Sequence, residues 1–298
     1  MSSVGGASGP GATSTPPPVS RMRKILVRTA TGASLAGAVA LLIWLADTLQ
    51  SSLPVLIVGA LLAAACGIEL LRMPGVGPSI GAPAVLGAWV MAVAWAWAAI
   101  GLTPHFDFGT AAATVYALVG VGLVSTVLRP VGRTAPSVGP SPWAAAWAVA
   151  PLPLLAWVHL DFGTRGLVVL IVLSKVGDIA GYYVGSAIGK HHPFKRLSPG
   201  KTTEGCLGSL VAGGIAGAAF GAAGGLPGEA GPGIGALVGL SINVASQAGD
   251  LLESYVKRTA GVKDSSTWLG ASGGFLDVTD SLLLSVPVAL LTWGAAFG

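Results

Sequence analysis

Five of the twelve acidic residues of the chain lie in one short stretch, residues 249–280. The charged residues of this stretch are Asp250, Glu253, Asp264, Asp277 and Asp280, with Lys257, Arg258 and Lys263 between them. Only 9% of the whole chain is charged, and charges are costly and rare near a bilayer. Carboxylates beside basic side chains can hold metal ions and phosphate groups together. The stretch is therefore our first candidate for a functional site.

A second polar segment, GKHHPFKRLSPGKTTEG, covers residues 189–205. Lys201 can offer a point charge to a phosphate group, and Ser198 and Thr202 can donate hydrogen bonds to it. The Gly-Lys-Thr at 200–202 is not a P-loop, because that motif needs a glycine where this chain has Lys195. The basic residues could instead contact anionic lipid head groups.

A third element is the pair Lys175 and Asp178, which are three residues apart and so share one helix face. A structural ion pair within the membrane would explain this pair equally well. Asp250 and Glu253 could likewise cap a helix end where it leaves the membrane. The coincidence of all these groups on one side of the protein favours a shared site.

The composition predicts an all-α integral membrane protein. The chain is 53% hydrophobic with a mean hydropathy of +0.76, whereas a soluble domain carries about 25% charged residues. Its pI near 9.3 is explained by loop charges and requires no nucleic-acid partner. Cys66 and Cys206 lie in apolar runs, and we interpret both as packing residues.

The apolar runs predict nine transmembrane helices and three regions. Residues 1–20 form a disordered Gly/Ser/Pro-rich tail, 21–160 the N-terminal helices, and 161–298 the C-terminal catalytic region. A basic cluster before the first apolar run indicates a retained helix and not a cleaved leader. Gly213, Gly217 and Gly221 predict a helix-packing face. The predicted helices are 25–46, 54–71, 82–103, 109–128, 142–159, 164–188, 205–225, 233–255 and 279–297.

Nine spans place all but two Lys and Arg residues on one side of the membrane, the exceptions being Lys175 and Arg165. The positive-inside rule then places the N-terminus and both charged segments in the cytoplasm. The C-terminus would lie on the opposite side. We therefore expect a multi-pass protein of the cytoplasmic membrane whose site faces the cytoplasm.

Three sequence segments resemble the phosphatidate cytidylyltransferases, which are integral-membrane CDP-diacylglycerol synthases. They are SPGKTTEG at 198–205, GDLLESYVKRTAGVKDS at 249–265 and ASGGFLDVTDS at 271–281. Asp178, followed by GYYVG, is similar to an acidic residue of the preceding helix in that family. Two positions depart from the family pattern: Ser272 replaces a histidine, and Val278 replaces an arginine.

The resemblance implies that a phosphate of phosphatidic acid attacks the α-phosphorus of CTP, so that pyrophosphate leaves. It implies Mg²⁺, with a second cation left open, held by Asp250 and Asp277. Asp264, Asp280 and Asp178 would either be additional ligands or support the ligands from behind. It assigns the catalytic roles to Asp250, Asp277, Lys257, Lys263 and Asp264, and substrate binding to Ser198, Lys201, Thr202, Glu204, Arg258, Ser265 and Asp178. CTP, phosphatidic acid and membrane lipids would be the partners, and a homodimer is left open.

Other functions remain open at this point. A CTP-dependent polyprenol or phytol kinase would use a related site for γ-phosphoryl transfer, and a CDP-archaeol-type synthase is another relative. A transporter could use an intramembrane Lys–Asp pair, although no inverted repeat is visible. The changes at Ser272 and Val278 would also suit an inactive scaffold.

Overall fold

The computed structural model describes residues 21–101, 142–226, 228 and 230–297, and within these ranges the chain is helical and contains no strand. This confirms the predicted all-α class. The tail at 1–20 and the helix predicted at 109–128 lie outside the described residues. The helices are α1 (Arg21–Thr48), α2 (Leu53–Arg72), α3 (Gly77–Ile80), α4 (Ala82–Gly101), α6 (Pro142–Val149), α7 (Leu155–Ile188), α8 (Thr203–Ala222), α9 (Pro232–Thr259), the 3₁₀ turn η2 (Gly270–Ser272) and α10 (Phe275–Phe297).

Four of the described helical segments are long and apolar enough to cross a membrane: Leu53–Arg72, Leu155–Ile188, Thr203–Ala222 and Phe275–Trp293. Each overlaps a segment predicted from the apolar runs. They support an integral membrane protein. The total of nine spans stays a prediction.

The prediction of one helix over 142–159 is wrong. Helix α6 ends at Val149, residues 150–154 form turns, and α7 begins at Leu155. Pro151 and Pro153 explain the break, because proline lacks an N–H and disfavours helical geometry in the residue before it. Helix α7 is also kinked at Gly163 (φ 66°, ψ −171°). This kink coincides with the connection that we predicted before residue 164.

The predicted glycine face on α8 is confirmed as the contact with α9. Gly213, Gly217 and Gly221 are buried. A Cβ atom on Gly221 would lie 2.6 Å from the carbonyl oxygen of Gly231, and one on Gly217 would overlap the carbonyl oxygen of Gly235. The absence of side chains therefore lets the two backbones approach closely, which is how small residues promote helix packing in lipid.

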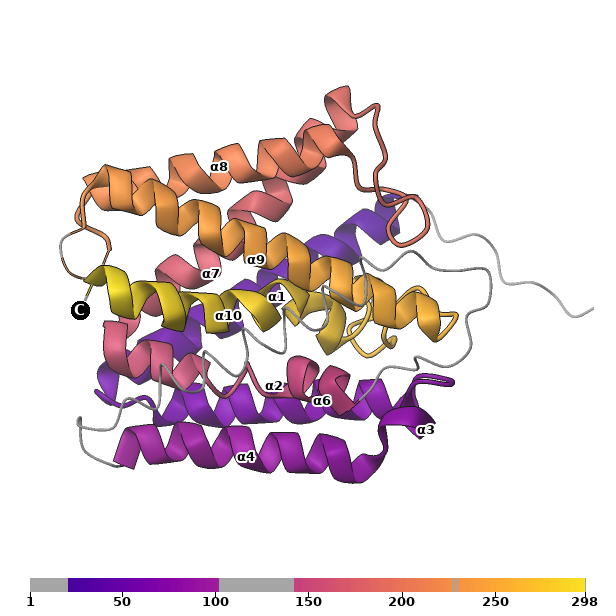
Figure 1. The fold of residues 1–298 in the computed structure, drawn as a ribbon, viewed down its shortest axis with the longest axis horizontal. Coiled ribbons are helices and arrows are strands. Elements are labelled where there is room, and N and C mark those ends of the chain that lie inside the picture. The colour runs from indigo at the N-terminus through magenta and orange to yellow at the C-terminus, as the bar shows by residue number, and fades with distance from the viewer. Residues whose placement is uncertain (1–20, 102–141, 227, 229, 298) are drawn as a thin grey trace, which may run out of the picture.

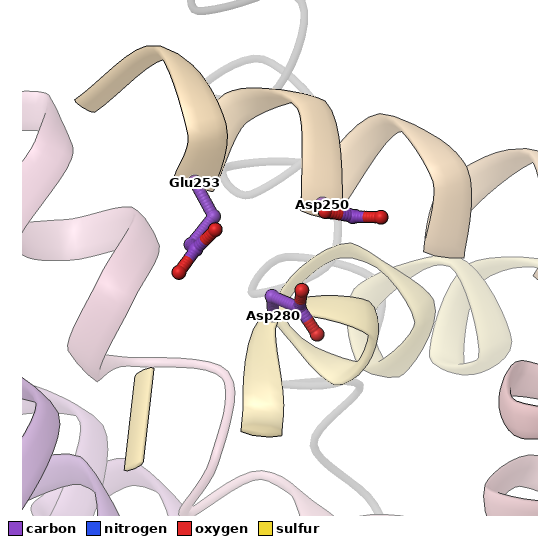
Figure 2. A group of neighbouring side chains, drawn as sticks. All are labelled: Asp250, Glu253 and Asp280. Carbon is purple, nitrogen blue, oxygen red and sulfur yellow. The ribbon is translucent and has the colours of Figure 1, made fainter. Parts of the chain in front are cut away.

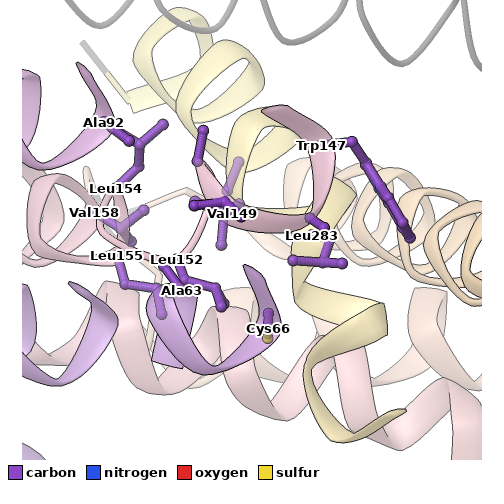
Figure 3. Close-up of a cluster of buried hydrophobic side chains, with 14 of the residues drawn as sticks. Ala63, Cys66, Ala92, Trp147, Val149, Leu152, Leu154, Leu155, Val158 and Leu283 are labelled. Carbon is purple, nitrogen blue, oxygen red and sulfur yellow. The ribbon is translucent and has the colours of Figure 1, made fainter. Parts of the chain in front are cut away.

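A second packing region joins α2, α6, the turn at 150–154 and α10 (Figure 3). Trp147, Leu152 and Leu283 are almost completely buried there. Cys66 lies in the same cluster, and its sulfur is 3.4 Å from the Thr279 hydroxyl. Both cysteines are free thiols, as expected of packing residues. This core holds α2 against α10.

The two charged segments meet at one end of the helix bundle. Figure 1 shows the connection before α8, residues 189–202, at the same end as the connection between α9 and α10, residues 260–274, and as α3. The C-terminus of α10 and the connection between α8 and α9 lie at the other end. The fold thus brings together the polar segments that the sequence singled out.

Candidate active site

Three carboxylates from two helices form the centre of the candidate site. One oxygen from each of Asp250, Glu253 and Asp280 lies within 4.8 Å of the others. Figure 2 shows Asp250 and Glu253 on α9 beside Asp280 on α10. Gly249 permits this closeness, since a Cβ at that position would collide with the carbonyl oxygen of Asp280. Asp250 and Asp280 were both predicted metal ligands, whereas Glu253 was not.

The geometry of this carboxylate cluster suits a divalent cation. Three clustered carboxylates repel one another unless positive charge or protons lie between them. Glu253 is only 1% exposed, and its Oε1 atom has no hydrogen-bond partner among the described residues. A buried carboxylate oxygen without a partner is costly, and coordination to a hard cation would satisfy it. The cluster of Asp250, Glu253 and Asp280 therefore fits a Mg²⁺ site.

Lys201 connects the second polar segment to this cluster. Its Nζ atom is 2.6 Å from Oδ2 of Asp250. The next residue, Thr202, caps α8, because its hydroxyl oxygen accepts a hydrogen bond from the N–H of Gly205 at 3.0 Å. The start of α8 is thereby fixed beside α9, with a lysine directed at the carboxylates.

A cavity of about 240 Å³ opens beside Lys201 and Asp250, between α7, α8 and α9. Its walls combine glycines, which leave space, with polar side chains, which can orient a ligand. Asp178, Thr202 and Gln247 contribute to this polar lining. The cavity is thus open to a substrate group immediately next to the carboxylate cluster.

Glu204 and Arg258 hold the polar segments in shape. Glu204 accepts hydrogen bonds from His191 Nδ1 at 2.6 Å and from the backbone N–H of Lys190 at 3.1 Å. Arg258 donates to the carbonyl oxygens of Leu197 at 3.2 Å and Val262 at 3.0 Å. The predicted substrate-binding residues Glu204, on α8, and Arg258, on α9, therefore bind groups of the connecting loops, and Arg258 joins the two charged segments.

Asp277 lies in a separate network at the start of α10. Its Oδ1 accepts a hydrogen bond from Lys257 Nζ at 2.5 Å. Its Oδ2 accepts from the Ser265 N–H at 2.8 Å, the Ser265 hydroxyl at 2.7 Å and the Gly274 N–H at 2.7 Å. Both carboxylate oxygens are thus engaged by protein donors. Asp277 was predicted as a metal ligand and Ser265 as a substrate-binding residue. In the structure, Ser265 donates hydrogen bonds to Asp277.

Lys257 joins this network to the carboxylate cluster. Its Nζ atom is 2.5 Å from Glu253 and 2.5 Å from Asp277. Burial by itself lowers the pKa of Lys257, but the two carboxylates outweigh that effect, and the pKa lies above its usual value. Lys257 therefore stays protonated and balances charge between Glu253 and Asp277.

The pair Lys175 and Asp178 combines structural and site features. The two groups are 3.8 Å apart. Lys175 also donates to the Ser281 hydroxyl at 2.7 Å and to the Val278 carbonyl at 3.1 Å, which ties α7 to α10. Asp178 lines the cavity described above. The structural ion pair and the substrate-site interpretation are therefore compatible.

The remaining predicted residues lie at the edge of the site. Lys263 and Asp264 are exposed, and Ser198 is half-buried. The structure does not bring Asp264 into the carboxylate cluster. At the two departures from the family pattern, Ser272 donates its N–H to the Leu269 carbonyl at 3.1 Å, and Val278 contributes the carbonyl oxygen that Lys175 contacts.

Glu69 on α2 was not predicted as a site residue, and it is completely buried. It accepts hydrogen bonds from two serine hydroxyls and from two backbone N–H groups at the start of α10. A signal was present, because Glu69 is the only acid in the apolar run LPVLIVGALLAAACGIELLR. An ionisable residue within a membrane helix is a functional candidate by default.

Comparison with known proteins agrees with the sequence segments. A model of the cytidylyltransferase family matches residues 26–294. A phosphatidate cytidylyltransferase of Brucella suis is 34% identical over 207 residues, which cover 68% of this chain and 73% of the relative. One from Mycobacterium leprae is 36% identical over 160 residues, covering 49% and 48% respectively. One from Mycobacterium bovis is 31% identical over 214 residues, covering 67% and 65%.

Proposed function

Because the chain belongs to the cytidylyltransferase family, we propose that it transfers the cytidylyl group of CTP to phosphatidic acid. A phosphate oxygen of phosphatidic acid forms a bond to the α-phosphorus of CTP, and the bond from that phosphorus to the bridging oxygen breaks. The products are CDP-diacylglycerol and pyrophosphate. The enzyme is therefore a nucleotidyltransferase of phospholipid synthesis.

One observation carries the proposal: the carboxylate cluster, Lys201 and the cavity adjoin one another at the end of the bundle where the charged segments meet. Both reactants are highly anionic, so the reaction depends on neutralising charge and aligning two phosphates. A cation held by carboxylates would draw the phosphates together. Lys201 adds positive charge at the cavity wall, where a phosphate would displace part of its contact with Asp250.

The cation in the proposal is Mg²⁺, held by Asp250, Glu253 and Asp280. It would supply charge neutralisation for the phosphate groups of CTP. The oxygens of the cluster meet the preference of Mg²⁺ for hard ligands, and few protein carboxylates are needed because water and phosphate complete its shell. Asp277 would support this site through Lys257, and Asp264 and Asp178 remain candidates for further cation or substrate contacts.

The basic and polar groups of the two charged segments would bind substrate phosphates or hold the site in shape. We propose that Lys201, Ser198 and Thr202 face one phosphate group, while Lys257 orients Glu253. Arg258 and Glu204 keep the two segments together. Lys263 is exposed and would act on substrate as it arrives from solution.

We propose that this end of the bundle faces the cytoplasm, because the Lys and Arg residues concentrate there. CTP would then reach the site from solution. Phosphatidic acid would enter from the cytoplasmic leaflet, with its acyl chains remaining in lipid. A homodimer is compatible with this arrangement but is not required by it.

The alternative of a CTP-dependent lipid kinase is distinguished by its second product. Purified protein would be incubated with CTP, phosphatidic acid and Mg²⁺, and the soluble products would be separated. Pyrophosphate formed in amounts equal to CDP-diacylglycerol supports the proposal. Release of CDP in a parallel reaction with a polyprenol in place of phosphatidic acid would indicate the kinase, and neither product with either lipid would indicate the transporter or the scaffold. Lys201→Met, which removes the cation at the cavity wall, should reduce the yield.

A further inference from the structure

Glu69 lies within hydrogen-bond distance of four donor groups at the boundary between α2 and the charged end of the bundle. Its Oε1 accepts from the Ser266 hydroxyl at 2.7 Å and the Phe275 N–H at 2.9 Å. Its Oε2 accepts from the Leu276 N–H at 2.9 Å and lies 2.8 Å from the Ser265 hydroxyl, whose single proton it shares with Asp277. The side chain is 0% exposed. This carboxylate is therefore held entirely by donors from outside its own helix.

The two N–H groups belong to the first residues of α10, Phe275 and Leu276. Such groups have no partner within their own helix, and the helix N-terminus favours a negative charge. Glu69 thus caps α10 from a different helix. The start of α10 carries Asp277, and Asp280 follows one turn later, so their position depends on where this cap holds the helix.

Glu69 is also the end of a continuous line of polar contacts. The Ser265 hydroxyl lies 2.8 Å from Glu69 and 2.7 Å from Asp277. Asp277 contacts Lys257 at 2.5 Å, and Lys257 contacts Glu253 at 2.5 Å. This relay, Glu69–Ser265–Asp277–Lys257–Glu253, joins α2 to the carboxylate cluster.

The space around the relay leaves little room for adjustment. A Cβ atom on Gly274 would collide with the Ser265 hydroxyl and with Glu69. Because the donors enclose Glu69 on both oxygens, a glutamine would direct an amide N–H₂ at groups that themselves donate. Removal of one partner from such a buried network leaves the others unsatisfied.

We propose that Glu69 is a positioning residue for the transferase site: it fixes the start of α10 and the Ser265 hydroxyl, and through them the carboxylate cluster that holds the cation. This inference rests on the proposed function for its kinetic consequences. It gives the N-terminal helices, which carry none of the three recognised sequence segments, a direct part in shaping the site. Glu69 itself contacts neither the cluster nor the cavity lining.

The test compares Glu69→Gln and Glu69→Asp with the control Cys66→Ala in purified full-length protein. Cys66 lies one turn before Glu69 on the same helix and also contacts α10, but it is outside the relay. The measurements are kcat, the Mg²⁺ concentration for half-maximal activity, and, without substrates, the rise in melting temperature caused by Mg²⁺. The last measurement reports on the carboxylate cluster independently of turnover.

Glu69→Gln should lower kcat about 10- to 100-fold, since a displacement near 1 Å costs on that order. It should also raise the half-maximal Mg²⁺ concentration and reduce the Mg²⁺-dependent rise in melting temperature. Glu69→Asp retains the charge, so its kcat, its half-maximal Mg²⁺ concentration and its Mg²⁺-dependent rise in melting temperature should all lie between those of Glu69→Gln and the unmodified protein. Cys66→Ala should leave the Mg²⁺ dependence as in the unmodified protein, even where the melting temperature itself falls.

Unchanged Mg²⁺ dependence in Glu69→Gln, or the same change in Cys66→Ala, would overturn the proposal. If Glu69→Gln does not fold, Ser266→Ala provides the test, because it removes one donor to Glu69 without touching Asp277. A smaller change of the Mg²⁺ dependence in the same direction supports positioning. An unchanged Mg²⁺ dependence contradicts it. Failure of the unmodified protein to form CDP-diacylglycerol would refute the proposed function alone. Absence of any stabilisation by Mg²⁺ in the unmodified protein would overturn the positioning role.

Discussion

Lys201, two residues before α8, and Asp250, in the C-terminal half of α9, form an ion pair at 2.6 Å. The two residues belong to the two charged segments recognised in the sequence, so this contact assembles the site from distant parts of the chain. The side chain of Lys201 is 20% exposed and that of Asp250 is 30% exposed, so both are accessible to a ligand. A phosphate group could therefore exchange for Asp250 at Lys201 while a cation takes up the carboxylate.

The first prediction concerns the carboxylate cluster. Asp250→Asn and Asp280→Asn should each reduce turnover by at least about 100-fold, close to 3 kcal/mol of transition-state stabilisation, because a neutral amide replaces a charged ligand. Both should raise the Mg²⁺ concentration needed for half-maximal activity. Asp47→Asn is the matched control, since Asp47 is exposed, lies on α1 and is outside the cluster. Normal Mg²⁺ dependence in both cluster variants would show that other residues bind the cation.

The second prediction separates Asp277 from the cluster. Asp277→Asn should also lower turnover strongly and destabilise the protein, but it should raise the half-maximal Mg²⁺ concentration less than Asp250→Asn does, because Asp277 reaches the carboxylate cluster only through Lys257. Asp277 itself is bound by Lys257, Ser265 and Gly274. If Asp277→Asn instead shifts Mg²⁺ dependence as much as Asp250→Asn, Asp277 is a ligand, as the family resemblance implied.

The third prediction concerns the stability contributed by Lys257. Lys257→Met would leave Glu253 and Asp277 without their shared cation, and breaking a buried pair costs about 3–5 kcal/mol. Unfolding in detergent by a chemical denaturant should show that loss, whereas Lys263→Met, at an exposed position, should change little. Equal stability of the two variants would contradict the proposed charge balance.

The pH dependence of that stability follows from the raised pKa of Lys257. A group whose pKa is higher in the folded state stabilises the protein at every pH below its unfolded pKa, and this contribution is lost as the pH rises through the folded value. The difference between the unmodified protein and Lys257→Met should therefore persist across the neutral range and shrink only in strongly alkaline solution.

The sequence predicted the elements with long uninterrupted apolar runs well, as at α2 and α8, because length and hydropathy are local properties. It also predicted the contact between Gly213, Gly217 and Gly221 and another helix. It did not predict the break after Val149, although Pro151 and Pro153 were signals of it. The sequence could not show which groups Asp277 and Glu253 contact. Those contacts depend on how α9 packs against α10, and that packing depends on the close approach at Gly249.

The fourth prediction concerns Val278, where the family pattern has arginine. Lys263, a basic residue of the same charged stretch, is one candidate to compensate for the missing charge. The structure offers a second candidate, since Lys175 contacts the Val278 carbonyl at 3.1 Å. Lys175→Met should reduce activity more than Lys263→Ala, and Val278→Arg should partly restore activity to whichever variant loses it. If both variants are fully active, compensation is excluded.

Cytidylyl transfer is tested most directly by following each phosphate of CTP in separate reactions with phosphatidic acid and Mg²⁺. We expect label in the α-phosphate to enter the lipid fraction in amounts equal to the CDP-diacylglycerol formed. Label in the γ-phosphate should appear only in pyrophosphate, and Asp250→Asn should abolish both transfers. Entry of the γ-label into lipid, with the α-label remaining in CDP, would contradict cytidylyl transfer.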